Sequence, residues 1–344
     1  MFSGAMQRMF LIAHPSDIAA ARRCAVRMAG QLGLDESVCG KLAIVVTETA
    51  TNILKHAGHG KIVLKPLQRD PAPAVEVLAL DSGPGIANLA SCLRDGMSTT
   101  GTSGTGLGAM RRLAGYFDAY TAAGKGSAFY MRLGSGARAP APVPAIDIGA
   151  VCVPMRGEEF CGDAWSVMMN ERSVKVLVAD GLGHGPEAAR ASLAAVQTLW
   201  ANPDLTASQL LEAIHRALPA TRGAAVAVAQ PDFHAGQLHF AGIGNICASI
   251  VTHESTKNLV SHNGIVGHNM RKVQQFTDPL PPDGVCIMHS DGLSAQWDLR
   301  AYPGLLMHHP ALIAGVLYRD FARDRDDATI VAFRQTGPRQ ARHG

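Results

Sequence analysis

Apolar residues recur every three or four positions over residues 16–32 and again over 36–56, and this spacing predicts two amphipathic helices. Short apolar runs bounded by Gly, Pro and Asp residues predict strands. The other elements predicted in the first half are the strands 61–67, 74–80, 116–122 and 127–133 and a helix over 107–115. Their order predicts helices on one face of a largely antiparallel sheet, an α+β layer.

The second half of the chain is richer in predicted strands. Its helices are expected over 185–200, over 207–218 and within 310–322. Its strands are expected over 146–153, 164–169, 173–179, 224–229, 238–242, 248–252, 285–289 and 329–333. Many short strands with few helices predict two packed sheets flanked by helices.

Residues 134–145 separate the two halves and have the composition of a linker. Three prolines alternate with small residues, which favours an extended backbone and buries little surface. The halves then cover residues 1–133 and 146–344, and both lengths suit a single domain. The sequence therefore predicts two domains joined by a semi-rigid spacer.

Composition excludes several classes of protein. With 47% hydrophobic and 17% charged residues, the 344-residue chain is neither disordered nor fibrous. A net charge of +3 gives no strong field for nucleic acid or anionic lipid. We find no apolar stretch of roughly 20 residues and no signal peptide in residues 1–14. Seven scattered cysteines indicate reduced thiols, so we expect a cytoplasmic protein without a membrane or nucleic-acid partner.

Three features of the first half predict a nucleotide site together, although each alone has a simpler explanation. Glu48 and Asn52 share one helix face because they are spaced i,i+4. Asp81-Ser-Gly-Pro-Gly-Ile86 directly follows a strand, and its glycines let the backbone approach a ligand closely. The glycine-rich stretch 101–108 leads into a helix, whose N-terminal amides favour phosphate. Alone, these features could be a solvated helix face, a turn and a flexible loop.

In this order and spacing the three features resemble the nucleotide-binding fold of gyrase-type ATPases, heat-shock 90 chaperones, sensor histidine kinases and anti-sigma-factor kinases. The resemblance covers about residues 10–133 and implies an α/β sandwich that binds ATP with Mg²⁺. It implies that Asn52 binds Mg²⁺, that Asp81 accepts a hydrogen bond from adenine, and that Glu48 is the general base. The residues that would shape the adenine pocket are Gly83 and Gly85. Those that would line the phosphates are Gly104, Thr105, Gly106 and Gly108.

Within that family the first half is most similar to the switch kinase of the bacterial stressosome. Before Glu48 there is no helix pair with a phospho-acceptor histidine, and no transducer domain or long lid insert is present. The segment Gly96-Met-Ser-Thr-Thr100 is shared less by plain anti-sigma factors. The resemblance implies phosphorylation of Ser or Thr on a partner with a sulfate-transporter-and-anti-sigma-antagonist (STAS) domain.

Four aspartates of the second half stand at turns beside small residues. They are Asp163, Asp180, Asp291 and Asp326. Any one of them could simply begin a turn. Because Asp180 and Asp291 end apolar strands, their carboxylates can converge, and converging carboxylates repel one another unless they bind a divalent cation.

This ordered set resembles the 2C-class metal-dependent Ser/Thr phosphatases of the sporulation stage II E branch, with an α-β-β-α sandwich over about 146–334. The resemblance implies two Mn²⁺ or Mg²⁺ ions bound by Asp163, Asp180, the Gly181 carbonyl, Asp291 and Asp326. Asp327 is the alternative to Asp326. The phosphate-gripping arginine of eukaryotic relatives has only Arg156 as a counterpart, which we interpret as a surface charge. His184 could donate a proton to the leaving serine, cap a helix or make a structural contact.

The two sites together predict a bifunctional signalling regulator. The first domain would phosphorylate a STAS-domain partner and the second would dephosphorylate the same or a related partner. Two alternatives stay open at this stage. The first domain could instead sequester a sigma factor as a binding module, or it could regulate the phosphatase by binding ATP without transferring phosphate.

Overall fold

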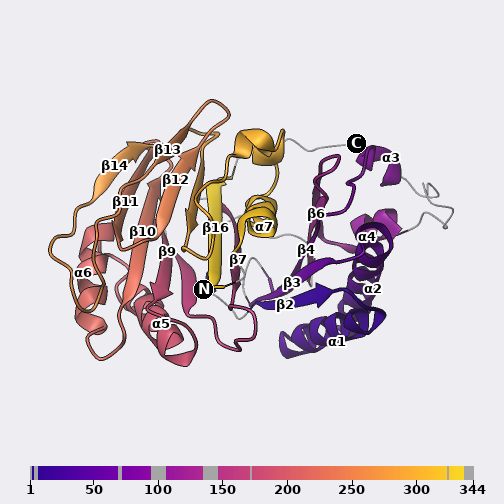
Figure 1. Cartoon of the computed structure of the whole chain (residues 1–344), viewed down its shortest axis with the longest axis horizontal. Coiled ribbons are helices and arrows are strands. Elements are labelled where there is room, and N and C mark those ends of the chain that lie inside the picture. The colour runs from indigo at the N-terminus through magenta and orange to yellow at the C-terminus, as the bar shows by residue number, and fades with distance from the viewer. Residues whose placement is uncertain are drawn as a thin grey trace. The chain divides into compact units, whose positions relative to one another are not determined.

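The computed structural model describes residues 2–3, 7–68, 72–93, 106–134, 146–170, 173–323 and 325–336. The chain divides into two compact units. Unit 1 comprises Met1–Gly4, Ala141–Arg300 and Asp320–Gly344, and unit 2 comprises Ala5–Pro140 and Ala301–Arg319. Most of the predicted linker lies outside the described residues, so its conformation stays a prediction. Figure 1 shows the elements of both units.

Unit 2 contains a five-stranded sheet in the order β2-β3-β4-β6-β5, and every neighbouring pair is antiparallel. Its strands are β2 (Arg8–Ile12), β3 (Gly60–Leu67), β4 (Ala74–Asp81), β5 (Tyr116–Thr121) and β6 (Ser127–Gly134). Its helices are α1 (Pro15–Gln31), α2 (Glu36–Asn52), α3 (Leu89–Cys92) and α4 (Gly106–Leu113), with a π-helical turn, η1, at Ile53–Ala57. The predicted sheet is confirmed, and β2 is an edge strand that the pattern did not predict.

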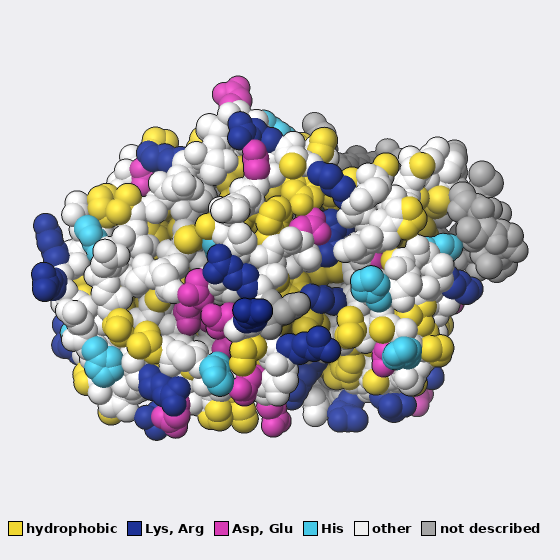
Figure 2. All heavy atoms as spheres, viewed as in Figure 1, with side chains coloured by type: hydrophobic (Ala, Val, Ile, Leu, Met, Phe, Trp, Pro, Cys, Tyr) yellow, Lys and Arg dark blue, Asp and Glu magenta, His cyan; other side chains and the backbone are white. Residues whose placement is uncertain are grey.

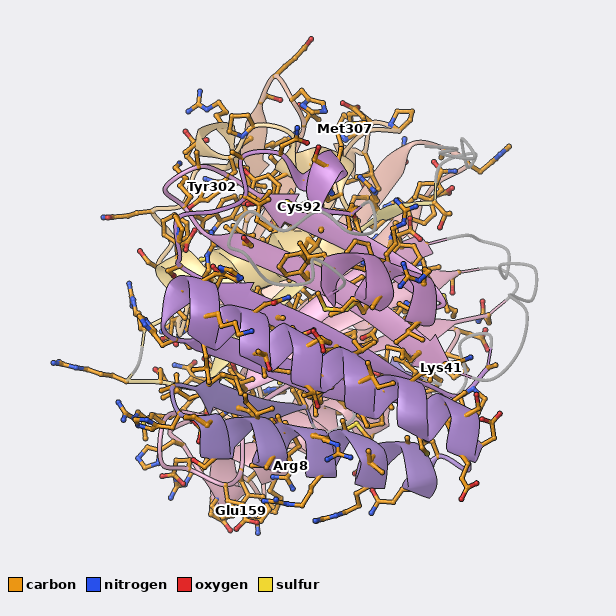
Figure 3. The ribbon with its side chains drawn as sticks, turned by 90° about the vertical axis from the view of Figure 1, so that its right-hand side faces the viewer. Arg8, Lys41, Cys92, Glu159, Tyr302 and Met307 are labelled. Atoms are coloured by element: carbon orange, nitrogen blue, oxygen red, sulfur yellow. The ribbon has the colours of Figure 1, made fainter. Side chains whose placement is uncertain are left out.

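Local sequence explains where α1 and α2 begin. Asp17 Oδ2 accepts hydrogen bonds from the Ala13 and His14 amides, at 3.0 and 2.8 Å, and Pro15 occupies the first turn. The Asp35 carboxylate accepts a hydrogen bond from the Val38 amide at 2.8 Å and so caps α2. Both helices lie over one face of the sheet in Figure 3.

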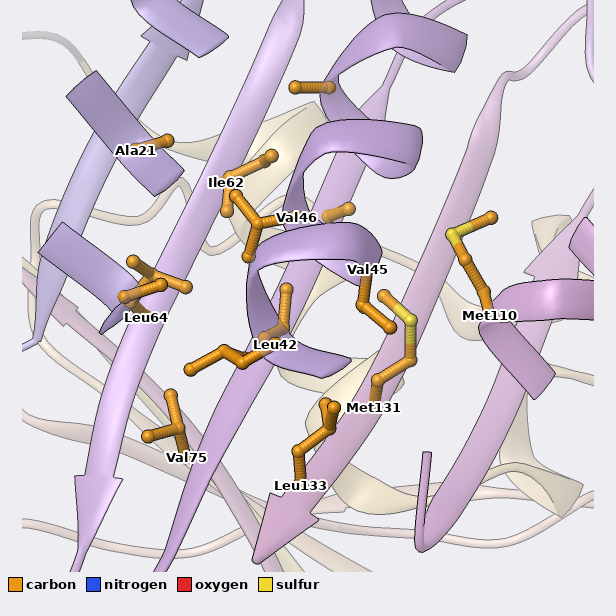
Figure 4. Close-up of a cluster of buried hydrophobic side chains, with 14 of the residues drawn as sticks. Ala21, Leu42, Val45, Val46, Ile62, Leu64, Val75, Met110, Met131 and Leu133 are labelled. Carbon is orange, nitrogen blue, oxygen red and sulfur yellow. The ribbon is translucent and has the colours of Figure 1, made fainter. Parts of the chain in front are cut away.

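The core of unit 2 lies between these helices and the sheet. Figure 4 shows Leu42, Val45 and Val46 of α2 pointing toward side chains of the strands, among them Ile62 and Met131. All five of these side chains are fully buried. Burial of such side chains contributes roughly 1.5–3 kcal/mol each relative to exposure, so this layer fixes α2 and the Glu48–Asn52 turn upon it.

The opposite face of the unit 2 sheet is covered as well. The segment Ala301–Arg319 belongs to unit 2 and contains most of α7 (Pro310–Phe321). A Cβ placed at Gly315 would lie within 3.0 Å of the Leu78 and Leu80 side chains, so α7 packs closely on β4. The sequence expectation put these residues in the second domain, because nothing in their local pattern shows which sheet they cover.

Polar groups on that face are paired. Glu76 is buried and forms ion pairs with Lys65 at 3.1 Å and Arg132 at 3.2 Å, and Tyr130 donates a hydrogen bond to it. Its burial would raise the pKa, but the two cations outweigh this effect and hold the pKa of Glu76 at about 2. His309 stacks on the Tyr130 ring with centroids 4.4 Å apart. The charged and polar groups of this face are therefore paired with one another, which allows the face to be buried.

Unit 1 contains two antiparallel sheets, as predicted for the second half. The first has the order β1-β8-β9-β10-β11-β14 and the second β13-β12-β15-β16-β7. The first sheet comprises β1 (Phe2–Ser3), β8 (Asp163–Met169), β9 (Val174–Gly181), β10 (Ala224–Asp232), β11 (Gln237–Ile243) and β14 (Phe276–Pro279). The second comprises β7 (Ile146–Val153), β12 (Cys247–Val251), β13 (Thr256–Asn258), β15 (Val285–His289) and β16 (Ala328–Gln335).

Helices α5 (Pro186–Ala201) and α6 (Ala207–Ala217) pack on the first sheet. One apolar core joins the two sheets through residues such as Trp165, Phe240 and Phe333, and another lies beneath the helices. The short strands β1, β13 and β14 were not predicted. None of the described helices is long and apolar enough to cross a membrane. All seven cysteines are free thiols.

Candidate functional sites

The first site in unit 2 lies where α2, β4 and α4 meet. A Cβ placed at Gly106, the first residue of α4, would lie 3.0 Å from Glu48 Oε2 and 3.7 Å from Asn52 Nδ2. The structure therefore brings the end of the glycine-rich stretch against both polar residues of α2. Gly108, two residues further along α4, is buried. The predicted phosphate residues Gly104 and Thr105 lie outside the described residues.

Asp81 ends β4, where the backbone fixes its carboxylate. Its Oδ1 accepts hydrogen bonds from the Gly83 amide at 2.9 Å and the Ser127 amide at 3.3 Å. Burial raises the pKa of Asp81, and these two hydrogen bonds offset part of the rise. An oriented, partly buried carboxylate suits the recognition of an exocyclic amino group.

Close backbone contacts shape the turn after Asp81. Gly85 has a φ of +75°, and a Cβ there would lie 2.3 Å from the Ala122 carbonyl oxygen, so a side chain does not fit. A Cβ at Gly83 would lie 2.8 Å from Ala57 Cβ, in η1. The Ile86 amide donates a hydrogen bond to Thr121 Oγ1 at 2.7 Å. The turn is thus held between η1 and the end of β5.

Sequence reasoning missed three contributors to this site. Thr121 and Ser127 hold the Asp81 turn, and both come from a hairpin distant in sequence. The π-helical turn directly after Asn52 was missed because the apolar periodicity continues through it. Single π turns are frequent at functional sites, so this turn is itself a sign of a site. The change of helical pitch that reveals it can be seen only in the structure.

The second site lies at strand ends in unit 1. Asp163 and Asp180 are direct cross-strand neighbours on β8 and β9. Asp163 is buried, and its Oδ2 accepts a hydrogen bond from Ser290 Oγ at 2.6 Å. Asp291 Oδ2 accepts one from Asn245 Nδ2 at 2.7 Å. Figure 2 shows acidic side chains gathered near the ends of β9 and β16.

The charge of this cluster is the clearest sign of a ligand. Burial, and after it the nearby carboxylates of Asp163 and Asp291, raise the pKa of Asp180 to about 9. Burial likewise raises the pKa of Asp163 well above its ordinary value. Crowded carboxylates with raised pKa values fit divalent cations, and an all-oxygen donor set favours Mg²⁺ or Mn²⁺.

The described side chains do not form a ready-made cage. Across the described ranges, no three His, Cys, Asp or Glu side chains are close enough together to hold a metal ion. The aspartates are neighbours that a cation would draw together, and the ligand set stays a prediction. Gly181 is packed so tightly that a Cβ would lie 2.1 Å from the Ala188 carbonyl oxygen.

The geometry bears on the choice between Asp326 and Asp327. Asp327 accepts hydrogen bonds from the Met155 amide at 2.8 Å and the Gly162 amide at 2.9 Å, so both of its oxygens are engaged. Asp326 accepts one from the following amide at 2.9 Å through a single oxygen. This arrangement favours Asp326 as the ligand and makes Asp327 a clamp between β16 and the turn before β8.

Two further residues flank the cluster. His184 Nδ1 lies 2.8 Å from Glu158 Oε1, while Gly185 is the residue that precedes α5. The pairing with Glu158 places His184 in a structural contact and not at the helix cap. Arg156 is exposed.

The comparisons with known proteins identify both halves. Residues 11–133 match the histidine kinase-like ATPase domain family, and residues 170–336 match the family of Stage II sporulation protein E (SpoIIE). The first half belongs to the family of RsbT-like Ser/Thr kinase domains, and the chain joins this domain to a SpoIIE-type phosphatase domain. Both resemblances and the predicted fold class are thereby confirmed.

Two relatives from Bacillus subtilis (strain 168) correspond to the two halves. The chain is 32% identical to the serine/threonine-protein kinase RsbT over 111 residues, which cover 32% of this chain and 84% of RsbT. It is 26% identical to the phosphoserine phosphatase RsbX over 152 residues, which cover 42% of this chain and 73% of RsbX.

Two solved structures each resemble just over half of the chain. One, described as belonging to the bacterial stressosome, is 26% identical with a TM-score of 0.52 and covers 55% of this chain and 99% of its own. The structure of RsbX in complex with magnesium has a TM-score of 0.50 at 21% identity, covering 56% of this chain and 96% of its own, and shows the fold. The roles of individual site residues stay predictions.

Proposed function

We propose that this chain adds phosphate to and removes phosphate from one STAS-domain partner, and so sets the phosphorylation level of a signalling switch. The observation that carries the proposal is the meeting of Gly106 with Glu48 and Asn52 in the same chain as the crowded aspartates of unit 1. Because a site for phosphate transfer and a site for phosphate hydrolysis lie in one chain, we infer that both act on the same substrate.

In unit 2, Asp81 would fix the adenine and Asn52 would hold the Mg²⁺ that neutralises charge on the phosphates of ATP. Glu48 then accepts the proton of the partner's Ser or Thr hydroxyl as that oxygen forms a bond to the γ-phosphorus. The bond from the γ-phosphorus to the bridging oxygen breaks, and ADP leaves. Glu48 suits this role because it lies one helical turn from Asn52 on the same face of α2.

In unit 1, Asp163, Asp180, Asp291 and Asp326 would hold two Mn²⁺ or Mg²⁺ ions, which supply an activated water and charge for the phosphoryl oxygens. Ser290 and Asn245 donate hydrogen bonds to Asp163 and Asp291 and so limit the orientations of these two carboxylates. The water oxygen would bond to phosphorus as the ester bond breaks, and a proton of the water would pass to the leaving oxygen, so that inorganic phosphate and the serine or threonine hydroxyl are released.

The partner class rests on the relatives. RsbT is named a serine/threonine-protein kinase, RsbX a phosphoserine phosphatase, and one matching structure is described as part of the stressosome. A fusion of the two types supports a STAS-domain substrate for both activities, with a sigma factor as a further partner if the first domain acts as a binding module.

One observation favours a second function, a phosphatase regulated by ATP. The segment Ala301–Arg319 packs on the sheet of unit 2 although the residues after it return to unit 1. Regulation of the phosphatase by ATP does not exclude phosphate transfer. The assay described next tests whether transfer occurs.

The test uses full-length protein, ATP labelled at the γ-phosphate and purified STAS-domain proteins encoded near the gene. We expect label to appear on a Ser or Thr of one partner and to be released when ATP is exhausted and Mn²⁺ is present. If the protein binds ATP but labels none of the partners while it dephosphorylates them, the regulated phosphatase replaces the bifunctional enzyme.

A further inference from the structure

Arg319, near the end of α7, contacts the backbone of the predicted adenine pocket. Its Nη1 donates hydrogen bonds to the Asp81 carbonyl oxygen at 3.0 Å and to the Ser127 carbonyl oxygen at 3.5 Å. The Ser127 amide in turn donates to the Asp81 carboxylate at 3.3 Å. Arg319 therefore holds the two strand ends that orient the Asp81 side chain, although it comes from the C-terminal part of the chain.

The rest of the segment is anchored to the same sheet. Tyr318 donates a hydrogen bond to Met9 Sδ at 3.0 Å and receives one from Lys61 Nζ at 3.4 Å. At the other end, Asp118 accepts hydrogen bonds from the His309 amide and from His308 Nδ1, both at 2.8 Å. With contacts at both ends and at Gly315 between them, α7 is docked along its length on unit 2.

The same chain segment leads directly to the predicted metal ligands of unit 1. Asp326 follows Arg319 by seven positions. In between, the Phe321 carbonyl accepts a hydrogen bond from the Ser294 amide at 2.9 Å, and the Arg323 amide donates to the Gly292 carbonyl at 2.7 Å. Those bonds tie the segment to the turn that begins at Asp291. The segment that docks on the unit 2 sheet therefore continues into backbone that is hydrogen-bonded next to Asp291.

We propose that Arg319 is a positioning residue for nucleotide binding, and that α7 links nucleotide occupancy of unit 2 to metal binding in unit 1. The inference rests on the proposed function, because it takes Asp81 as the adenine residue and the aspartates as metal ligands. The structure contains both the docked Arg319 and the cross-strand pair of Asp163 and Asp180. A nucleotide that fixes Asp81 stabilises this state, so it strengthens metal binding, and the coupling is reciprocal.

The test measures two quantities on full-length protein. One is the affinity for the β,γ-imido analogue of ATP by calorimetry. The other is the free Mn²⁺ concentration for half-maximal hydrolysis of para-nitrophenyl phosphate, with and without saturating analogue and with free Mn²⁺ buffered. The analogue transfers no phosphate and the small ester needs no partner, so neither readout depends on the kinase reaction. The variants are Arg319→Ala, Arg319→Lys and Asp81→Asn, with Arg23→Ala, an exposed arginine of α1, as the matched control.

We expect the analogue to lower the Mn²⁺ requirement of the wild type and of Arg23→Ala by roughly five- to tenfold, at the lower end of the usual span of allosteric coupling. Arg319→Ala should bind the analogue three- to tenfold more weakly and lose the Mn²⁺ response, while Arg319→Lys keeps part of both. Asp81→Asn should show no response, which excludes chelation by the nucleotide.

Each contrary result has a separate meaning. An unchanged Mn²⁺ requirement in wild type that binds the analogue overturns the coupling and leaves the proposed function standing. Wild-type affinity in Arg319→Ala overturns the positioning role. Absence of analogue binding by the wild type overturns the nucleotide site itself, and the inference with it.

Discussion

The two sites of this chain differ in the groups that surround their carboxylates. In unit 2, the amides of Gly83 and Ser127 donate hydrogen bonds to Asp81 and offset part of the rise in its pKa that burial causes. In unit 1, the nearest charged neighbours of Asp180 are other carboxylates, and its pKa lies at about 9. The comparison indicates that the predicted nucleotide pocket is organised before a ligand arrives, whereas the predicted phosphatase site would need cations to complete it.

Removing one carboxylate from the phosphatase site should have the largest effect. Asp180→Asn or Asp291→Asn takes away a charged ligand, so Mn²⁺-dependent hydrolysis of a phosphoprotein should fall by roughly 10³-fold or more. Chelation with EDTA should abolish the wild-type rate, and added Mn²⁺ should restore it. Asp232→Asn, at an exposed hairpin turn, is the matched control. Wild-type turnover in either ligand variant would refute the metal assignment.

Substitutions of the two polar residues of α2 should have different effects on nucleotide binding and phosphate transfer. Glu48→Gln is nearly isosteric and keeps the pocket filled, so ATP should bind normally while phosphate transfer falls by roughly 10²–10⁴-fold. Asn52→Ala removes the predicted Mg²⁺ ligand, so nucleotide binding and transfer should weaken together. Calorimetry and a transfer assay on each variant separate these outcomes. If Glu48→Gln transfers at the wild-type rate, the general base lies elsewhere.

A glycine substitution tests whether the nucleotide pocket is organised in advance. Gly85→Ala adds a Cβ in a left-handed turn and 2.3 Å from a carbonyl oxygen, so it should cost about 1–3 kcal/mol of stability and weaken ATP binding. Gly124→Ala shares the positive φ but has no atom within 4 Å of the added Cβ. Equal ATP affinity in the two variants would show that the close contact at Gly85 is unimportant.

The smallest expected effect concerns the covered face of unit 2. The folded pKa of Glu76, about 2, lies below its ordinary 4.5, so its stabilising contribution is complete above 4.5 and is lost as the pH falls toward 2. We expect the free energy of unfolding of unit 2 to fall by on the order of 2 kcal/mol over this range, and to fall less in Glu76→Gln.

All five tyrosines lie in unit 2 and all three tryptophans in unit 1. Fluorine NMR of fluorotyrosine-labelled protein therefore follows unit 2, while tryptophan fluorescence follows unit 1. An identical pH response in wild type and Glu76→Gln would show that the buried ion pairs do not govern this behaviour.

Most helices and strands could be predicted from the local sequence, but the contacts between segments far apart in the chain could not. The alternation in β4 puts Val75, Val77 and Ala79 against the helices, and this was predictable. The contact of Leu78 and Leu80, on the other face, with Gly315 was not predictable. A contact between residues more than 230 positions apart produces no periodic pattern in the local sequence. The sequence showed that the second face was apolar without showing what covers it.

The sites divide in the same way. Residues that begin or end elements, such as Asp81, Asp180 and Asp291, stand out in sequence because a turn follows them. The groups that form hydrogen bonds to such aspartates include Ser127, Ser290 and Asn245. They come from other strands or from the turns that follow them, and they look like ordinary polar residues until the sheets are paired.

The central claim, that one chain adds and removes phosphate on one partner, is tested most directly by the steady-state phosphorylation of that partner. Wild-type protein, a STAS-domain partner, ATP, Mg²⁺ and Mn²⁺ are mixed, and the phosphorylated fraction is followed by mass spectrometry. We expect an intermediate plateau in wild type, a plateau near complete phosphorylation in Asp180→Asn, and none in Glu48→Gln. The same plateau in all three proteins would contradict the account.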